Sequence, residues 1–254
     1  MPRQIIKTKA IVLRSWRTGE TSKRVAFYTE EHGKLTVIAK GARKPKSKFG
    51  GCLELMNEVG AVVYMRSDRD LQTLSDCDLD RSFPKLAGDV ERLSFGSASC
   101  ELVDRLTIDG EPNRDLYRCL AGALGALEEV SSAQVEPVFW YFQLRVCQAL
   151  GYRPELRHCV SCGGECVEHD RRFSTALGGV ICGPCSATDD QQSMRISQES
   201  VNFLAHLQGL RTYRREVIPD VPGNAREPRL ILSGFLEFHA ERRGSLRSLE
   251  FLKE

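Results

Sequence analysis

The chain has 254 residues, of which 41% are hydrophobic and 28% charged, and its net charge is +2 at pH 7. This is the balance of a folded globular protein, and it excludes an intrinsically disordered chain. No apolar run reaches the roughly 18 residues that a transmembrane helix needs, and Ile11–Leu13 is too short for the core of a signal peptide. We therefore expect a cytoplasmic protein that does not associate with a membrane.

The charge is distributed unevenly along the chain. Residues 1–50 contain 13 Lys and Arg against 3 Glu and no Asp, which gives this segment a net charge of +10. The other 204 residues therefore carry −8. A basic segment on an acidic body indicates a polyanionic partner such as nucleic acid, although a solvated lysine-rich face would give the same pattern.

The first third of the chain has the pattern of short strands rich in Val, Ile, Thr and Tyr, separated by turn residues such as Gly19, His32-Gly33 and Gly50-Gly51. Five antiparallel strands over about 75 residues favour a small barrel such as an OB-fold, and an SH3-like barrel fits the periodicity almost as well. The predicted strands are Thr8–Ser15, Arg24–Glu30, Lys34–Lys40, Glu58–Met65 and Leu71–Ser75.

The periodicity changes to helical spacing after residue 85. One apolar stripe runs from Leu116 to Leu127 and a second from Val135 to Leu150. After a break, Ser197 is a predicted N-cap, and residues 228–243 form a last amphipathic helix that Gly244 ends. These stripes indicate helices that pack into a core.

Between the helical segments lie two Cys-x-x-Cys pairs, which are separated by 19 residues. The pairs are Cys159 with Cys162 and Cys182 with Cys185. This spacing is typical of a tetrahedral Zn²⁺ site with four thiolate ligands. Because four protein ligands leave no position for water, we expect one structural Zn²⁺. Cys166 and His158 are possible further ligands, but both fit better as bystanders.

A catalytic zinc site of the deaminase type would need H-x-E followed by P-C-x-x-C. Here Pro184 lies between the two cysteines, and neither His158 nor His169 is followed by Glu two residues later. The chain also lacks the phosphate-binding P-loop, the HExxH helix and the GxSxG turn. We therefore predict that the protein is not an enzyme.

The densest run of charge is Lys40–Lys48, which we expect to be an exposed loop that contacts phosphates. Near it, cations flank the first predicted inter-strand loop, which contains Trp16, and single-strand binders combine such cations with aromatic rings on which bases stack. Phe27, Tyr28 and Phe49 are further candidates for stacking, although each fits the core better. The predicted DNA contacts are Arg14, Trp16, Lys23, Arg24, Lys40, Arg43, Lys44, Lys46 and Lys48.

Three N-terminal motifs resemble the signature of bacterial RecO recombination-mediator proteins: Gly19-Glu20, Thr29–Leu35 and Ala39–Ser47. The ending Gly244–Leu249 with Phe251-Leu252 resembles the C-terminus of that family, and the four-cysteine cluster lies where many members have a zinc finger. Lys40, Arg43, Lys44 and Ser47 match the basic loop of the signature. The resemblance implies an N-terminal OB-fold, a helical domain and a zinc module.

The resemblance also implies a function and partners. The family binds single- and double-stranded DNA, anneals complementary strands, and acts with RecR at the nucleoid. It acts on DNA coated by single-strand-binding protein, whose acidic C-terminal tail is the expected ligand of the helical domain, so that RecA can load. The alternative is a zinc-containing transcription or RNA-processing factor with a basic barrel.

The predicted architecture is α+β with three parts. A five-stranded OB-fold DNA-binding domain occupies residues 1–80. A helical domain occupies residues 81–154 and 189–254, and the zinc module, residues 155–188, is inserted between its two parts.

Overall fold

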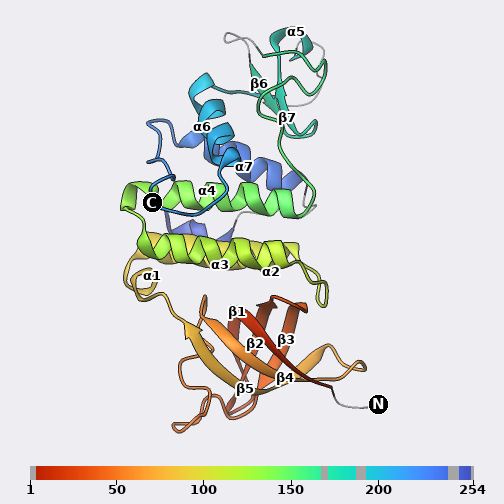
Figure 1. The fold of residues 1–254 in the computed structure, drawn as a ribbon, viewed down its shortest axis with the longest axis vertical. Coiled ribbons are helices and arrows are strands. Elements are labelled where there is room, and N and C mark those ends of the chain that lie inside the picture. The colour runs from red at the N-terminus through yellow and green to blue at the C-terminus, as the bar shows by residue number, and fades with distance from the viewer. Residues whose placement is uncertain (1–3, 167–170, 187–192, 240–245, 253–254) are drawn as a thin grey trace. The chain divides into compact units, whose positions relative to one another are not determined.

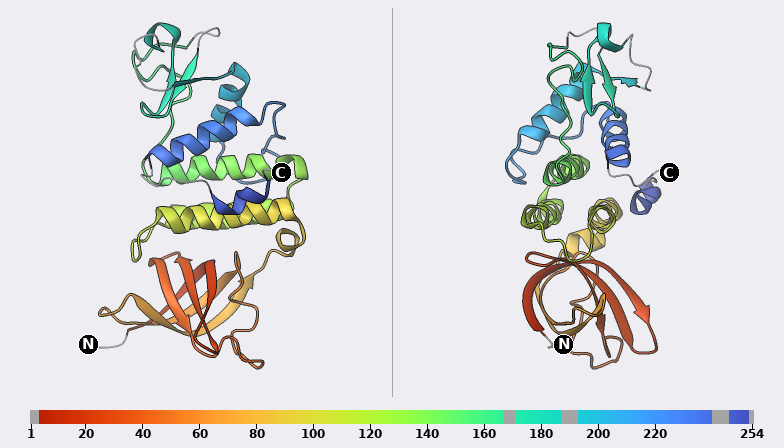
Figure 2. Two further views of the ribbon diagram at one scale, coloured as in Figure 1. Left: turned by 180° about the vertical axis from the view of Figure 1, so that it is seen from behind. Right: turned by 90° about the vertical axis from the view of Figure 1, so that its right-hand side faces the viewer.

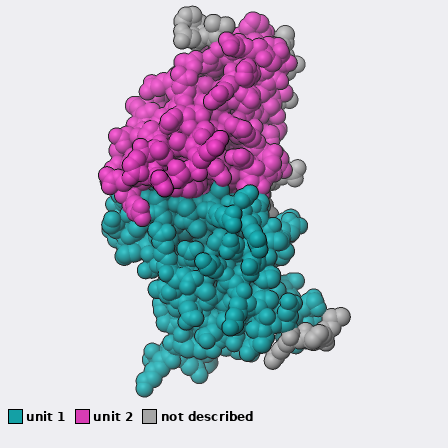
Figure 3. All heavy atoms as spheres, in the orientation of Figure 1, with its two compact units in different colours: residues 1–128, 246–254 teal, residues 129–245 magenta. Residues whose placement is uncertain are grey.

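The computed structural model describes residues 4–166, 171–186, 193–239 and 246–252. The chain divides into two compact units (Figure 3). Unit 1 comprises residues 1–128 and 246–254, and unit 2 comprises residues 129–245. The first helices thus group with the N-terminal strands, because one of them packs against the barrel; the domain boundaries expected from the sequence remain a prediction.

The N-terminal strands of unit 1 close into a barrel in the order β1-β2-β3-β5-β4 (Figure 1). β1 pairs with both β2 and β4, and β3 and β5 pair in parallel. This topology is an OB-fold, so that prediction is confirmed and the SH3-like alternative is wrong. The strands are β1 Gln4–Thr18, β2 Ser22–Thr29, β3 Gly33–Ala39, β4 Glu58–Met65 and β5 Leu71–Arg81.

The pattern of β1 explains how one strand closes the barrel. Its first half, Gln4–Ile11, pairs with β4, and its second half, Ala10–Thr18, pairs with β2. A register shift between Val12 and Arg14 lets the strand bend from one neighbour to the other. Its alternating apolar residues join a core shared with all other strands, which includes Ile6, Ala10, Val12, Val25, Phe27, Val37, Val59, Val63 and Leu74.

Four helical elements complete unit 1: α1 Pro84–Gly88, α2 Val90–Leu106, α3 Arg114–Glu129 and the 3₁₀ helix η1 Arg247–Leu252. The leucine stripe predicted α3, whereas α2 had no clear periodic signal, because its buried face consists largely of small residues such as Gly96, Ala98 and Ser99. α2 packs against β1, β2 and η1. Glu101 fixes η1 by accepting hydrogen bonds from the backbone of Arg247 and Ser248.

The turn before β3 connects the barrel to the loop before α3. Gly33 has φ +65°, and a Cβ on it would lie 2.1 Å from the carbonyl oxygen of Glu111. Next to it, the Lys34 amino group donates a 2.8 Å hydrogen bond to the Asp104 carbonyl and lies 3.5 Å from the carboxylates of Asp104 and Asp109. Lys34 therefore stabilises the fold and is not available as a loop cation.

The described residues of unit 2 form longer helices and a small module of short strands that contains the cysteines (Figure 2). The helices are α4 Ser132–Ala149, α6 Gln198–Gly209 and α7 Arg226–His239. The module contains β6 Arg172–Ser174, β7 Gly179–Ile181, α5 Gly183–Ser186 and β8 Ser193–Arg195, with the strand order β7-β6-β8.

Two predicted helix signals fall in unit 2. Ser197 is confirmed as an N-cap, since its side chain accepts a hydrogen bond from the backbone N–H of Ser200. Gly244, the predicted end of the last helix, lies outside the described residues. In the described part of the chain, no helix is long and apolar enough to cross a membrane.

We predict that Gly33→Ala destabilises unit 1 by about 2–4 kcal/mol, because the new methyl group collides with the backbone of Glu111 in addition to the strain of the left-handed conformation. Gly50→Ala is the matched control, since Gly50 also has positive φ (+44°) but has nothing within 4 Å of the added carbon. It should cost only about 1 kcal/mol. Equal shifts in the urea unfolding midpoints of the two variants would contradict the role of the close contact.

Candidate metal centre and nucleic-acid interface

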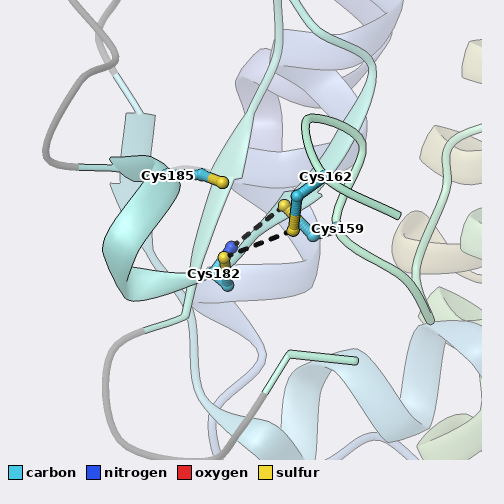
Figure 4. A group of neighbouring side chains, drawn as sticks. All are labelled: Cys159, Cys162, Cys182 and Cys185. Carbon is cyan, nitrogen blue, oxygen red and sulfur yellow. Dashed lines mark hydrogen bonds between the residues drawn. The ribbon is translucent and has the colours of Figure 1, made fainter. Parts of the chain in front are cut away.

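The four cysteines predicted as metal ligands converge in the module of unit 2 (Figure 4). Cys159 and Cys162 come from the loop after α4, Cys182 follows β7, and Cys185 lies in α5. All four sulfur atoms lie within 4.8 Å of one another, and those of Cys162 and Cys182 are 3.8 Å apart. Thiolates at about 2.3 Å from a tetrahedral Zn²⁺ would be about 3.8 Å apart, so the arrangement can hold a metal ion.

Local hydrogen bonds shape the turn of the first cysteine pair. Gly163 N–H donates to the Cys159 carbonyl and Cys159 N–H donates to the Gly164 carbonyl, both at 2.8 Å. Gly163 has φ +74°, a conformation that glycine adopts without strain. The result is a tight turn that points two sulfur atoms the same way.

Backbone N–H groups favour the thiolate form of Cys159, whereas hydrogen bonds with the neighbouring thiols raise the pKa of Cys185 to about 12. Burial raises the pKa of the Cys159 thiol, but backbone N–H groups of Cys182, Cys162 and Ser161 outweigh it and lower that pKa to about 6. The thiolate is the form that binds metal. Cys166 is buried but does not belong to the converging group of four, which agrees with its role as a bystander.

The predicted aromatic contact, Trp16, lies within β1 and not in the inter-strand loop expected from the sequence. It is half-buried and pairs across the sheet with Arg24. The guanidinium carbons of Arg14 and Arg24 lie 5.1 and 5.2 Å from the centre of its ring. Two exposed cations therefore flank one aromatic ring on the outer face of β1 and β2, an arrangement held by cation–π attraction.

The other three aromatic candidates for base stacking belong to the core. Phe27 and Tyr28 have no exposed surface, and Phe49 is 1% exposed. A base cannot reach rings in these positions, so the stacking interpretation is wrong for all three. Phe27 and Tyr28 point to opposite faces of β2, and both faces are buried. Phe27 lies in the core of the barrel, and the other face of β2 packs against α2.

Within the segment 40–57 between β3 and β4, some predicted DNA contacts hold the structure together. The Arg43 guanidinium donates to the carbonyls of Gly19 and Glu20, at 3.3 and 2.9 Å, and so fixes the β1–β2 turn. The Lys48 amino group donates to the Ser75 carbonyl, and Lys23 forms a 2.9 Å ion pair with Glu54. The predicted contacts thus include residues whose removal would alter the fold of the loop.

Lys40, Lys44 and Lys46 differ from these residues. All three are exposed, and within the described residues no hydrogen bond or ion pair occupies their amino groups. Negative charge is concentrated on β5, where Asp76, Asp78 and Asp80 are exposed. The loop and the outer face of β1–β2 therefore form a part of the barrel with accessible positive charge.

An OB-fold barrel with cations and a partly exposed tryptophan on one face has the features of the OB-fold nucleic-acid-binding proteins. Comparison with family models makes the assignment specific. Residues 1–83 match the model "Recombination protein O N terminal", and residues 87–250 match "Recombination protein O C terminal". The chain belongs to the RecO family of DNA repair proteins.

Individual relatives agree with the family models. The chain is 33% identical to the DNA repair protein RecO of Pelotomaculum thermopropionicum, covering 98% of this chain and 94% of that one. It is 34% identical to the protein of the same name from Anaeromyxobacter dehalogenans, covering 98% and 96%. The RecO of Salinibacter ruber is 39% identical over 74% of this chain and 71% of its own length.

We predict that replacing Lys40, Lys44 and Lys46 together with Ala weakens single-stranded DNA binding equally for all sequences, because phosphate contacts carry no sequence information. The slope of log affinity against log salt should flatten by roughly 2, as each phosphate contact contributes about 0.7 to 0.9. Fluorescence anisotropy of labelled DNA at several salt concentrations measures this slope.

The matched control for this experiment removes Lys85, Arg114 and Arg118, which are exposed cations of unit 1 outside the loop. It changes the net charge by the same amount and should leave the slope nearly unchanged. If both triple variants flatten the slope equally, the effect comes from net charge and the loop is not the contact surface.

Proposed function

We propose that this protein is a non-catalytic mediator of DNA repair and recombination. It binds single- and double-stranded DNA, anneals complementary strands, and acts with RecR to load RecA on DNA coated by single-strand-binding protein. The observation that carries the proposal is the accessible positive charge around Trp16 and Lys40–Lys46 on an OB-fold of the RecO family. The DNA repair relatives favour it over a transcription or RNA-processing factor.

Annealing requires no catalytic residue. Two complementary strands repel each other through their phosphates, and base pairing supplies the free energy once they meet. A protein that neutralises phosphates on both strands lowers this repulsion and raises the local concentration of one strand near the other. Electrostatic contacts and stacking surfaces are sufficient for such a role.

We further propose that the four cysteines bind one structural Zn²⁺. All ligands come from the protein, so the ion would hold the module of unit 2 together without supplying a reactive position. When bound, zinc would add coordination bonds to the small core of the module, in which Phe173, Val180 and Ile181 are buried.

The proposed protein partners are RecR and the acidic C-terminal tail of single-strand-binding protein. A tail of this kind combines an apolar anchor with carboxylates, which suits a helical surface that has both apolar and Arg side chains. We propose that the tail binds the helical domain, residues 81–154 and 189–254.

The experiment that tests the function is annealing of complementary DNA strands precoated with single-strand-binding protein, with and without RecR. We expect the full chain to accelerate annealing on coated strands and to lose most of this acceleration when the binding protein lacks its acidic tail. Annealing of naked strands should be unaffected by that truncation. A chain that anneals neither naked nor coated strands would overturn the proposed function.

For the metal, we predict about one zinc per chain by elemental analysis of protein purified without chelator. Replacing Cys162 and Cys185 with Ser should remove the metal and make residues 155–188 sensitive to proteolysis. Cys166→Ser is the matched control, since this buried cysteine stands outside the group of four and its loss should leave the zinc content unchanged. Metal-free wild-type protein with a protease-resistant module would contradict the assignment.

A further inference from the structure

Unit 2 has an exposed aromatic cluster at the end of α7 that the proposed function leaves unused. Tyr152 is 45% exposed and Phe238 is 53% exposed. His239 contacts both, with ring centres 5.7 Å from Tyr152 and 5.1 Å from Phe238. Its Nε2 lies 3.0 Å from the Thr175 carbonyl oxygen, and the buried Phe235 packs at 4.3 Å. Contacts of His239 with Thr175 and Phe235 thus hold the cluster in place, and the rings of Tyr152 and Phe238 are exposed to solvent.

Cations follow Tyr152 in the chain and contact α6. The Arg153 guanidinium donates a 3.2 Å hydrogen bond to Gln208 of α6, whose side chain donates to the Pro154 carbonyl at 2.8 Å. Further along, Arg157, Arg171 and His206 line a cavity of about 440 Å³. Its floor includes Leu156 and Val201, and none of the described residues that line it is a carboxylate.

One carboxylate, that of Glu155, lies within the segment 152–157. The Glu155 carboxylate accepts hydrogen bonds from the backbone N–H groups of Arg157 and His158, at 2.8 and 3.0 Å, so it is turned toward its own chain. Glu237 is exposed on α7 beside Phe238. The surface thus has exposed rings at one end and, at the other, three arginines, Arg153, Arg157 and Arg171, against the one carboxylate of Glu155.

We propose that this surface of unit 2, defined by Tyr152, Arg153, Arg157, His206 and Phe238, is a second binding surface for single-stranded DNA. Bases stack on the two exposed rings, and the phosphates lie against the Arg side chains and the cavity. Rows of aromatic rings beside cations are the combination that single-strand binders use. The proposal rests on the annealing function, because a second strand on the same molecule explains how two strands are brought together.

An acidic peptide is the other ligand that cations and apolar side chains could accept. The observations favour DNA, because two solvent-facing rings stand outside the cavity, where each can stack on a base. A peptide with a single apolar anchor would use the cavity and leave these rings without a role.

The first test uses the full chain with Lys40, Lys44 and Lys46 replaced by Ala, so that barrel binding is weakened. An oligothymidylate of about 12 nucleotides carrying photoreactive bases serves as the probe. We expect cross-links to peptides that contain Tyr152 or Phe238. Their absence, with cross-links only to the barrel, would overturn the second surface and leave the proposed function intact.

The second test adds ring variants to the same background. Tyr152→Ala and Phe238→Ala should each weaken the remaining affinity for the probe about tenfold, since loss of one stacking platform has an effect of this size. In the otherwise unaltered chain, both changes together should slow annealing of naked strands. Tyr152→Phe keeps the ring and should retain binding.

Leu230→Ala is the matched control, because Leu230 is a 47% exposed apolar residue on the same helix α7. It should change neither affinity nor annealing. The proposal is wrong if the ring variants bind and anneal like this control. It is also wrong if they lose only the binding of an acidic peptide ending in Phe, which would assign the surface to the peptide. Loss of annealing in the barrel variant alone would support the proposed function without this surface.

Discussion

Closure of the barrel by β1 is the constraint on which the rest of unit 1 depends. One strand of 15 residues pairs with β4 through its first half and with β2 through its second half. A strand that serves two neighbours must bend, and the register shift after Val12 provides the bend. Beyond this shift the outer face of β1 carries Arg14 and Trp16, so the same irregularity that closes the barrel positions the flanked tryptophan next to Arg24.

The basic segment divides its charges between structure and binding. Lys34 links the barrel to α2, Arg43 fixes the β1–β2 turn, and Lys48 contacts β5. Such contacts hold the backbone in place so that the remaining exposed lysines project from a defined surface. A binding loop of this kind gains affinity because less conformational entropy is lost when it meets the DNA backbone.

In unit 2, the candidate metal centre and the aromatic cluster differ in how far apart in the sequence their contacting residues lie. The four cysteines lie within 27 residues of one another in the chain, so their convergence depends on two local turns and a short sheet. The aromatic cluster around His239, in contrast, joins the end of α7, the β6–β7 turn and the segment after α4. Its existence requires the whole unit to be folded.

The sequence alone determined the five strands, the leucine-rich helix, the Ser197 cap and the four converging cysteines, because each of these follows from periodicity or short spacing within one segment. Only the tertiary structure decided which charged and aromatic residues are accessible. Phe27 and Phe49 are buried, Trp16 lies on a strand, and Arg43 bonds to carbonyls more than 20 residues away. Helix α2 was not predicted, because its buried face consists largely of small residues that become a packing surface only when the barrel lies against them. Accessibility and long-range hydrogen bonds arise from packing between segments, and no local pattern encodes them.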